Sequence, residues 1–219
     1  MKNQNLFVSL WSLRWSILAM AVLVVASNIL VQFVIPDMFL TWGAFTYPIA
    51  FLVTDLTNRI YGAAQARKVV FGGLIVGIVC SFIGTQIQGE FGPLVTWRIA
   101  LGSATAFFVA QMTDIFIFQT IQDRSYDREW KKAPLVSSLI GSVLDTAIFF
   151  FIAFSATSLS MLAVSDDGEW ALEDVPLLGF GPVLPLWVSL AVADWAVKFG
   201  IALIALIPFR LITVSMRTS

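Results

Sequence analysis

The chain has 219 residues, of which 58% are hydrophobic and only 12% are charged, and its formal net charge is −1. Soluble domains carry about 25% charged residues, so this composition is typical of a membrane protein with little mass outside the bilayer. The sequence contains one cysteine, Cys80, and no histidine. An intrachain disulfide, a histidine-based metal or haem site and serine–histidine hydrolysis are therefore excluded.

Hydropathy predicts an all-α membrane protein with six transmembrane helices in a single domain over residues 1–219. The first helix follows a short polar tail, and its apolar run is longer than that of a secretory signal, so we interpret it as retained. The second contains Pro48, where we expect a bend or an irregular start. The fifth is long enough to tilt or to extend beyond the bilayer. The predicted ranges are 15–35, 41–61, 69–88, 97–121, 134–163 and 185–209.

Lysine and arginine are distributed very unevenly between the predicted loops. With the N-terminus inside, ten basic residues lie in inside segments, and none lies in the outside loops near 36–40, 89–96 and 164–184. Cytoplasmic loops of membrane proteins carry an excess of Lys and Arg, so both termini are predicted to face the cytoplasm. The inside residues are Lys2, Arg14, Arg67, Lys68, Arg124, Arg128, Lys131, Lys132, Arg210 and Arg217.

Four aspartates lie inside stretches that are otherwise hydrophobic enough to cross a membrane. A carboxylate there costs at least ~2.5–3.5 kcal/mol, and it usually faces a cavity, a partner or a transport path. Four such residues in one short chain indicate a shared polar interior, as in a transporter. The four are Asp55, Asp114, Asp145 and Asp194.

Two of these aspartates have a basic residue four positions later, on the same helical face. Each such pair is either a structural ion pair or part of a ligand site, and the sequence leaves both interpretations open. Asp114 and Asp145 have no such neighbour, so each is expected to meet a partner on another helix, a proton or a ligand. The two pairs are Asp55–Arg59 and Asp194–Lys198.

Three amides accompany the aspartates. Gln111 lies three residues before Asp114 on the same face, and Asn28 and Gln32 are four apart on the first predicted helix. Each amide offers a donor and an acceptor at membrane depth. The alternative role for each is an interhelical hydrogen bond, which contributes only ~0.6 kcal/mol on average in membranes.

Several other chemistries are excluded by missing motifs. The chain has no GxxxxGK[ST] loop for nucleotide hydrolysis, no HExxH and no CxxC. It also lacks the GxGD pattern of intramembrane aspartyl proteases, in which two carboxylates act as an acid–base pair. No exposed basic stripe supports nucleic-acid binding. We therefore expect no enzyme activity, no cofactor, no metal and no nucleic-acid partner.

Three segments carry a resemblance to a known family: TWGAFTYPIAFLVTDLTNRIYGAAQARKVVFGG, SSLIGSVLDTAIFFFIAF and ADWAVKFG, in this order. Together they resemble the queuosine precursor transporters, also called vitamin uptake transporters. The more specific positions are Tyr47–Pro48, Thr54–Asp55, Asp114, Asp145–Thr146 and Lys198. Many members carry an acid where this chain has Arg59, so we expect no direct ligand role for that residue.

The resemblance implies uptake of 7-cyano- or 7-aminomethyl-7-deazaguanine across the bacterial inner membrane, for salvage into tRNA queuosine. A deazaguanine presents an N–H and an amino group side by side, which one carboxylate can accept together. Its flat face suits stacking on Phe45, Tyr47 or Trp195, although ordinary packing explains each ring equally well. A cationic aminomethyl group would be balanced by a second aspartate, and a neutral cyano group would suit Asn28 or Gln32.

The preferred interpretation is a carrier of a purine-like base that lies in the lipid bilayer and needs no ATPase partner. One alternative is the substrate-capture subunit of an energy-coupling-factor type vitamin transporter, and another is a structural scaffold. The sequence leaves open whether the protein is a monomer or a homodimer. The candidate substrate-binding residues are Asn28, Gln32, Phe45, Tyr47, Asp55, Gln111, Asp114, Asp145, Asp194 and Lys198.

Overall fold

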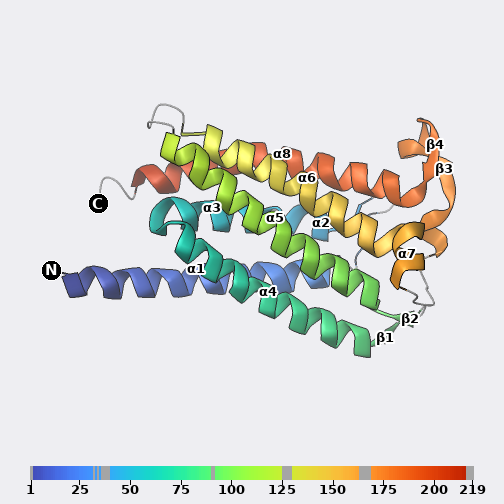
Figure 1. Ribbon diagram of the computed structural model, residues 1–219, viewed down its shortest axis with the longest axis horizontal. Helices are drawn as coiled ribbons and strands as arrows, with labels where there is room; N and C mark the ends of the chain where they lie inside the picture. The colour runs from blue at the N-terminus through green and yellow to red at the C-terminus, as the bar shows by residue number, and fades with distance from the viewer. Residues whose placement is uncertain are drawn as a thin grey trace.

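The computed structural model describes residues 2–31, 33, 35, 40–89, 92–124, 130–162 and 169–215. It is a bundle of long helices that run roughly side by side (Figure 1). The helices are α1 (Lys2–Leu30), α2 (Gly43–Thr46), α3 (Ile49–Tyr61), α4 (Ala63–Gln86), α5 (Trp97–Arg124), α6 (Lys132–Phe154), α7 (Ala156–Leu162) and α8 (Leu186–Ser215).

The start of α1 and the end of α8 lie at the same end of the bundle, and the short strands lie at the other (Figure 1). Strands β1 (Gln88–Gly89) and β2 (Gly92–Pro93) form one antiparallel pair, and β3 (Asp174–Pro176) and β4 (Val183–Pro185) form another. Two 3₁₀ turns, η2 (Glu169–Leu172) and η3 (Leu177–Gly179), flank β3. These elements are connections at the end of the bundle, and the core is entirely helical.

Five helices are long and apolar enough to cross a membrane: α1 over Leu13–Leu30, α4, α5, α6, and α8 over Leu186–Val214. The prediction of an all-α membrane protein is confirmed. Three predicted ranges agree with α4, α5 and α8 to within about six residues. The first predicted range starts two residues after the apolar span of α1, Leu13–Leu30, but it runs five residues too far at its end, and the helix itself begins earlier, at Lys2.

The second predicted helix, 41–61, is wrong as one continuous element. The chain forms α2 and α3 with a break at Tyr47–Pro48, which is where the bend was expected. Alone, α3 has 13 residues and a length of ~20 Å, which is shorter than the ~30 Å hydrocarbon core. Gly62, with φ at +84°, ends α3 and starts α4 in a backbone conformation that residues with a Cβ rarely adopt.

The fifth predicted helix, 134–163, is also wrong as a single element. α6 ends at Phe154, Ser155 is extended, and α7 follows. The cause lies on α5, where the buried Arg98 side chain donates hydrogen bonds to Ile152 O at 3.3 Å and to Ser155 O at 2.9 Å. The Arg98 guanidinium also donates a hydrogen bond to Ser158 Oγ on α7, at 3.0 Å. A guanidinium thus binds the carbonyls at the C-terminal end of α6, where a positive charge is favoured.

We expect Arg98→Ala to destabilise the protein, because Arg98 is only 2% exposed and its loss leaves buried carbonyls without a donor. Each buried acceptor without a partner costs about 1–3 kcal/mol. Arg98→Lys should recover only part of the loss, because an ammonium lacks the planar fork of donors. Thermal unfolding of the detergent-solubilised protein measures this. The control is Arg124→Ala, at the exposed C-terminal end of the same helix. Equal melting temperatures for the two alanine variants would contradict the prediction.

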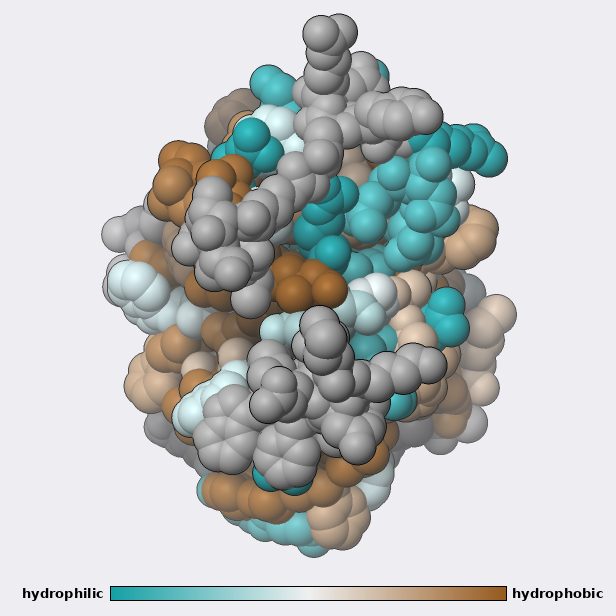
Figure 2. Space-filling view, turned by 90° about the vertical axis from the view of Figure 1, so that its left-hand side faces the viewer, coloured by the Kyte–Doolittle hydropathy of each residue, from teal (hydrophilic) through white to brown (hydrophobic). Residues whose placement is uncertain are grey.

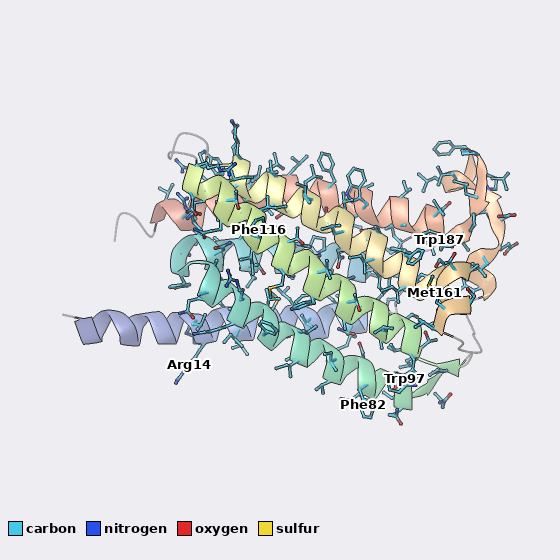
Figure 3. All side chains as sticks on the ribbon, in the orientation of Figure 1. Arg14, Phe82, Trp97, Phe116, Met161 and Trp187 are labelled. Atoms are coloured by element: carbon cyan, nitrogen blue, oxygen red, sulfur yellow. The ribbon has the colours of Figure 1, made fainter. Side chains whose placement is uncertain are left out.

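The outer surface of the bundle is suited to lipid. Figure 2 views the end at which α1 starts, and hydrophilic side chains gather around its loops while hydrophobic ones occupy much of the flanks. Exposed basic residues at this end include Arg14, Lys68 and Lys131. Toward the opposite end, Figure 3 places Phe82, Trp97, Met161 and Trp187. Aromatic residues are enriched at membrane interfaces, so this distribution agrees with helices that cross a bilayer.

Candidate functional site

The four membrane aspartates divide into two groups, and the first surrounds Lys198 on α8. The Lys198 ammonium donates to Asp145 Oδ2 at 2.7 Å and to Thr146 Oγ1 at 3.0 Å, both on α6. It also pairs with Asp194, one turn earlier on α8. Thr146 in turn donates to Asp194 Oδ2 at 2.8 Å. We call Asp145, Thr146, Asp194 and Lys198 the lysine group.

The lysine group is almost completely buried, with side-chain exposures of 5% for Lys198, 4% for Asp145 and 15% for Asp194. One ammonium therefore balances two carboxylates. The contacts of the lysine group use one oxygen of each carboxylate, so within the described chain the Oδ1 atoms of Asp145 and Asp194 remain available as acceptors. The predicted Asp194–Lys198 pair is confirmed, and Asp145 finds the same lysine from another helix.

The second group consists of Asp55 on α3 and Asp114 on α5, which are both buried where these two helices pack together. Asp55 accepts hydrogen bonds from Ser138 at 3.0 Å and, at a long 3.4 Å, from Ser137. Both contacts come from α6 and not from α3, where the spacing had offered Arg59 as a partner. We call Asp55 and Asp114 the acid pair.

Two hydrogen bonds between α3 and α5 lie on either side of the acid pair. Thr54 Oγ1 donates to Gln111 Oε1 at 2.6 Å, and Asn58 Nδ2 donates to Ile115 O at 3.1 Å. Both connect residues that are 57 apart in sequence, so the two helices run in parallel with one register. This register places Asp114 against Asp55.

Close packing of α5 against α6 completes the surroundings of the acid pair. A Cβ on Gly141 of α6 would lie 3.4 Å from Asp114 Cβ and only 2.7 Å from the Phe51 ring. Only a residue without a side chain therefore fits at position 141 without a shift of Phe51. The approach of the two helices helps bury Asp114 completely.

A cavity of about 360 Å³, including its open mouth, connects the two groups between α3, α6 and α8. Its polar lining consists of Asp55, Ser138, Ser142 and Lys198, and its walls include the rings of Phe51 and Phe209. Asp55 and Lys198 line this cavity, whereas Asp114, Asp145 and Asp194 are not among its lining residues, although all four aspartates were expected around one cavity. We call this space the central cavity.

A second cavity of about 270 Å³ lies between α1, α4 and α5, and Asn28 and Tyr47 contribute to its lining. The Asn28 amide donates to Val24 O at 2.8 Å. The Tyr47 ring contacts Phe107 edge-on, with ring centroids 6.0 Å apart, and its centroid lies 5.9 Å from Lys198 Nζ. Tyr47 thus lies between the second cavity and the lysine group.

The remaining candidates lie elsewhere. Phe45 is 37% exposed and packs against Trp42 outside both cavities. Trp195 stacks on Phe199 with ring centroids 5.9 Å apart. Gln32 lies outside the described residues.

Sequence reasoning missed the serines of α6, although a signal was present. Ser138, Ser142 and Asp145 recur at helical spacing, so one polar stripe faces α3 and α8. Among the residues that the structure describes, no group of three or more Asp, Glu, His or Cys side chains is arranged to hold a metal ion.

Comparisons with known proteins agree with this polar membrane interior. Residues 41–213 match the family model described as "Putative vitamin uptake transporter". The chain belongs to this family. It is 31% identical to the "Queuosine precursor transporter" of Escherichia coli strain K12 over 94% of this chain and 87% of that protein. It is 33% identical to the "Probable queuosine precursor transporter" of Haemophilus influenzae, over 77% of this chain and 66% of that one.

No solved structure matches the chain. The family assignment makes the protein a transporter and not an enzyme, as the sequence predicted. With its apolar helices, the transporter is a multi-pass membrane protein.

Proposed function

We propose that the transporter imports queuosine precursors, the 7-substituted 7-deazaguanines, across the bacterial inner membrane for salvage into tRNA. The names of its relatives support this substrate class. The structural observation that carries the proposal is the 2.7 Å pairing of Lys198 with Asp145 at the end of the central cavity.

The pairing suits the polar edge of a deazaguanine. That edge presents a carbonyl oxygen, a ring N–H and an amino group in sequence, so it accepts once and donates twice. Lys198 can donate to the carbonyl, and a neighbouring carboxylate can accept both donors in a charge-assisted contact. The free Oδ1 atoms of Asp145 and Asp194 leave capacity for these donors.

The central cavity suits the rest of such a molecule. Ligand sites of about 300–1,000 Å³ with mostly apolar walls and a few polar groups are the usual form of a small-molecule pocket. The central cavity has this kind of lining, with aromatic walls at Phe51 and Phe209 and with Asp55 and Lys198 among its few polar groups. An aminomethyl cation would be balanced there by Asp55.

We further propose six membrane crossings with both termini in the cytoplasm, α2 and α3 together forming the second crossing. Exposed basic residues lie at the end of the bundle where α1 starts and α8 ends, including Arg67, Lys68 and Arg124. The exposed Glu173 and Asp174 lie before and at the start of β3, at the opposite end. This charge asymmetry supports the assignment.

The topology predicts which cysteine an impermeant thiol reagent reaches. In a Cys80→Ala background, Asp174→Cys should be labelled in intact spheroplasts, and Lys131→Cys only after permeabilisation. Both positions are exposed, so a difference in labelling reports the side of the membrane and not burial. The reverse pattern would overturn the orientation.

Uptake of each labelled deazaguanine by the purified transporter in liposomes tests the function. We expect uptake without any ATPase component, and restored tRNA queuosine in cells that cannot make the precursor. Uptake only with an added ATPase module would favour the substrate-capture alternative. Guanine as competitor tests whether the 7-substituent is recognised, and an absence of binding or uptake for both deazaguanines would reject the proposed substrate.

A further inference from the structure

The acid pair is buried away from the balancing charge of the lysine group. Asp114 is 0% exposed and Asp55 is 2% exposed, and the α3–α5 hydrogen bonds on either side of them bring the two residues to facing sides of these helices. Within the described chain, neither Asp114 oxygen accepts a hydrogen bond of normal geometry. Two ionised carboxylates in contact at low dielectric repel each other strongly, and such pairs are stable when they share one proton.

Among the ion pairs of the described residues, the lysine nearest to the acid pair binds other carboxylates. Lys198 of α8 is bound to Asp145 and Asp194. On α3, Arg59 follows Asp55 by one turn, but the hydrogen-bond partners of Asp55 are serines of α6. The remaining basic residues of α5 and α6 lie at the helix ends: Arg98, Arg124 and Lys132.

Two buried amides beside the acid pair also have an unpaired atom each, one an acceptor and the other a donor. Asn58 and Gln111 flank the acid pair on α3 and α5, at 1% and 0% exposure. Asn58 Oδ1 and Gln111 Nε2 have no hydrogen-bond partner in the described structure. Buried polar atoms are nearly always paired. These two unpaired atoms beside Asp114 therefore mark a site whose hydrogen bonding is incomplete. Asp114 and Asn58 together offer three unfilled acceptors.

A proton fits this site better than a metal cation. Asp55 and Asp114 lie on facing sides of α3 and α5, and Ser137 and Ser138 donate to Asp55. A proton between the carboxylates needs no further space, whereas a metal ion has to displace these hydrogen bonds and separate its oxygen ligands.

The position of the acid pair connects it to the central cavity. Asp55 lines the cavity directly, and Asp114 lies behind it. A molecule in the cavity therefore contacts one member of the pair, so its binding and the protonation of the pair influence each other reciprocally.

We propose, on the basis of the import function above, that Asp55 and Asp114 share one proton and form the proton-coupling site of the transporter. The empty pair takes up its one proton from the outer side before the deazaguanine binds, and it releases this proton to the cytoplasm when the deazaguanine leaves. One proton enters with each substrate molecule, and no bond of the substrate is broken.

The shared proton is tested without substrate by infrared spectroscopy of the purified protein. We expect the C=O stretching band of a protonated carboxyl group at neutral pH, which should disappear in the Asp55→Asn/Asp114→Asn double variant. Surface Asp123→Asn should keep the band. A wild-type protein without the band, or a double variant that retains it, would overturn the shared proton even if the protein transports deazaguanine.

The coupling is tested in liposomes under an imposed inward pH gradient, with exchange of labelled for unlabelled substrate measured in parallel. The wild type should accumulate 7-cyano-7-deazaguanine at least ~10-fold and acidify the lumen upon substrate addition. Asp114→Asn should lose the accumulation, so that its accumulation divided by its exchange rate falls far below the wild-type ratio. Accumulation driven only by sodium, or unchanged in Asp114→Asn, would overturn proton coupling. A wild type that shows neither exchange nor uptake would reject the proposed substrate and leave the infrared result to decide the proton site.

Discussion

Lys198→Met should abolish deazaguanine uptake at limiting substrate. Lys198 is the only basic residue in the lysine group, and its ammonium contacts Asp145, Thr146 and Asp194. Removing one partner of a buried ion pair costs about 3–5 kcal/mol, because the remaining charge is uncompensated. Here two carboxylates would remain, so we expect a loss of more than ~100-fold in uptake together with reduced stability.

A compensated variant separates the two effects of Lys198→Met. Combining it with Asp145→Asn and Asp194→Asn removes all three charges while keeping the side chains close to their original size. We expect the melting temperature to recover and uptake to remain absent. If the compensated variant transported normally, the lysine group would be a structural ion cluster, and the binding site would have to be assigned to the Asp55 end of the central cavity.

The sequence predicts interactions within a helix far better than interactions between helices. The Asp194–Lys198 pair follows from a spacing of four residues and is present. The partner of Asp145 depends on how α6 lies against α8, and no spacing in the sequence encodes that crossing. For Asp55, the spacing suggests a partner on the same helix, Arg59, but the hydrogen-bond donors that the packing of α6 brings to it are serines.

The two helix breaks differ in the same respect: a local residue explains one of them, and a contact from another helix accompanies the other. The break before α3 follows from Pro48, whose ring restricts the residue before it and removes a backbone donor. The break at Ser155 has no proline or glycine beside it. It coincides with the contacts of Arg98, a side chain 57 residues earlier in the chain. A local pattern therefore located the first break and could not have located the second.

Asp145→Asn should weaken substrate binding by ~30- to 1,000-fold, which corresponds to ~2–4 kcal/mol. The variant keeps the size and one acceptor oxygen, but it removes the charge and replaces the second oxygen with an amide donor. That donor would face either the Lys198 ammonium or the substrate's own N–H groups, and both arrangements leave donors without acceptors. Binding measured by calorimetry or by exchange in liposomes gives the magnitude.

The control for Asp145→Asn is Asp123→Asn on the surface of α5, where the carboxylate accepts a hydrogen bond from the Gln119 amide at 2.8 Å. Its charge is exposed, so we expect no measurable change in binding. Asp194→Asn provides a graded comparison, because Asp194 is more exposed than Asp145 and shares the same lysine. A smaller loss in Asp194→Asn than in Asp145→Asn would identify Asp145 as the carboxylate that accepts the substrate. Wild-type affinity in both variants would show that neither carboxylate contacts it.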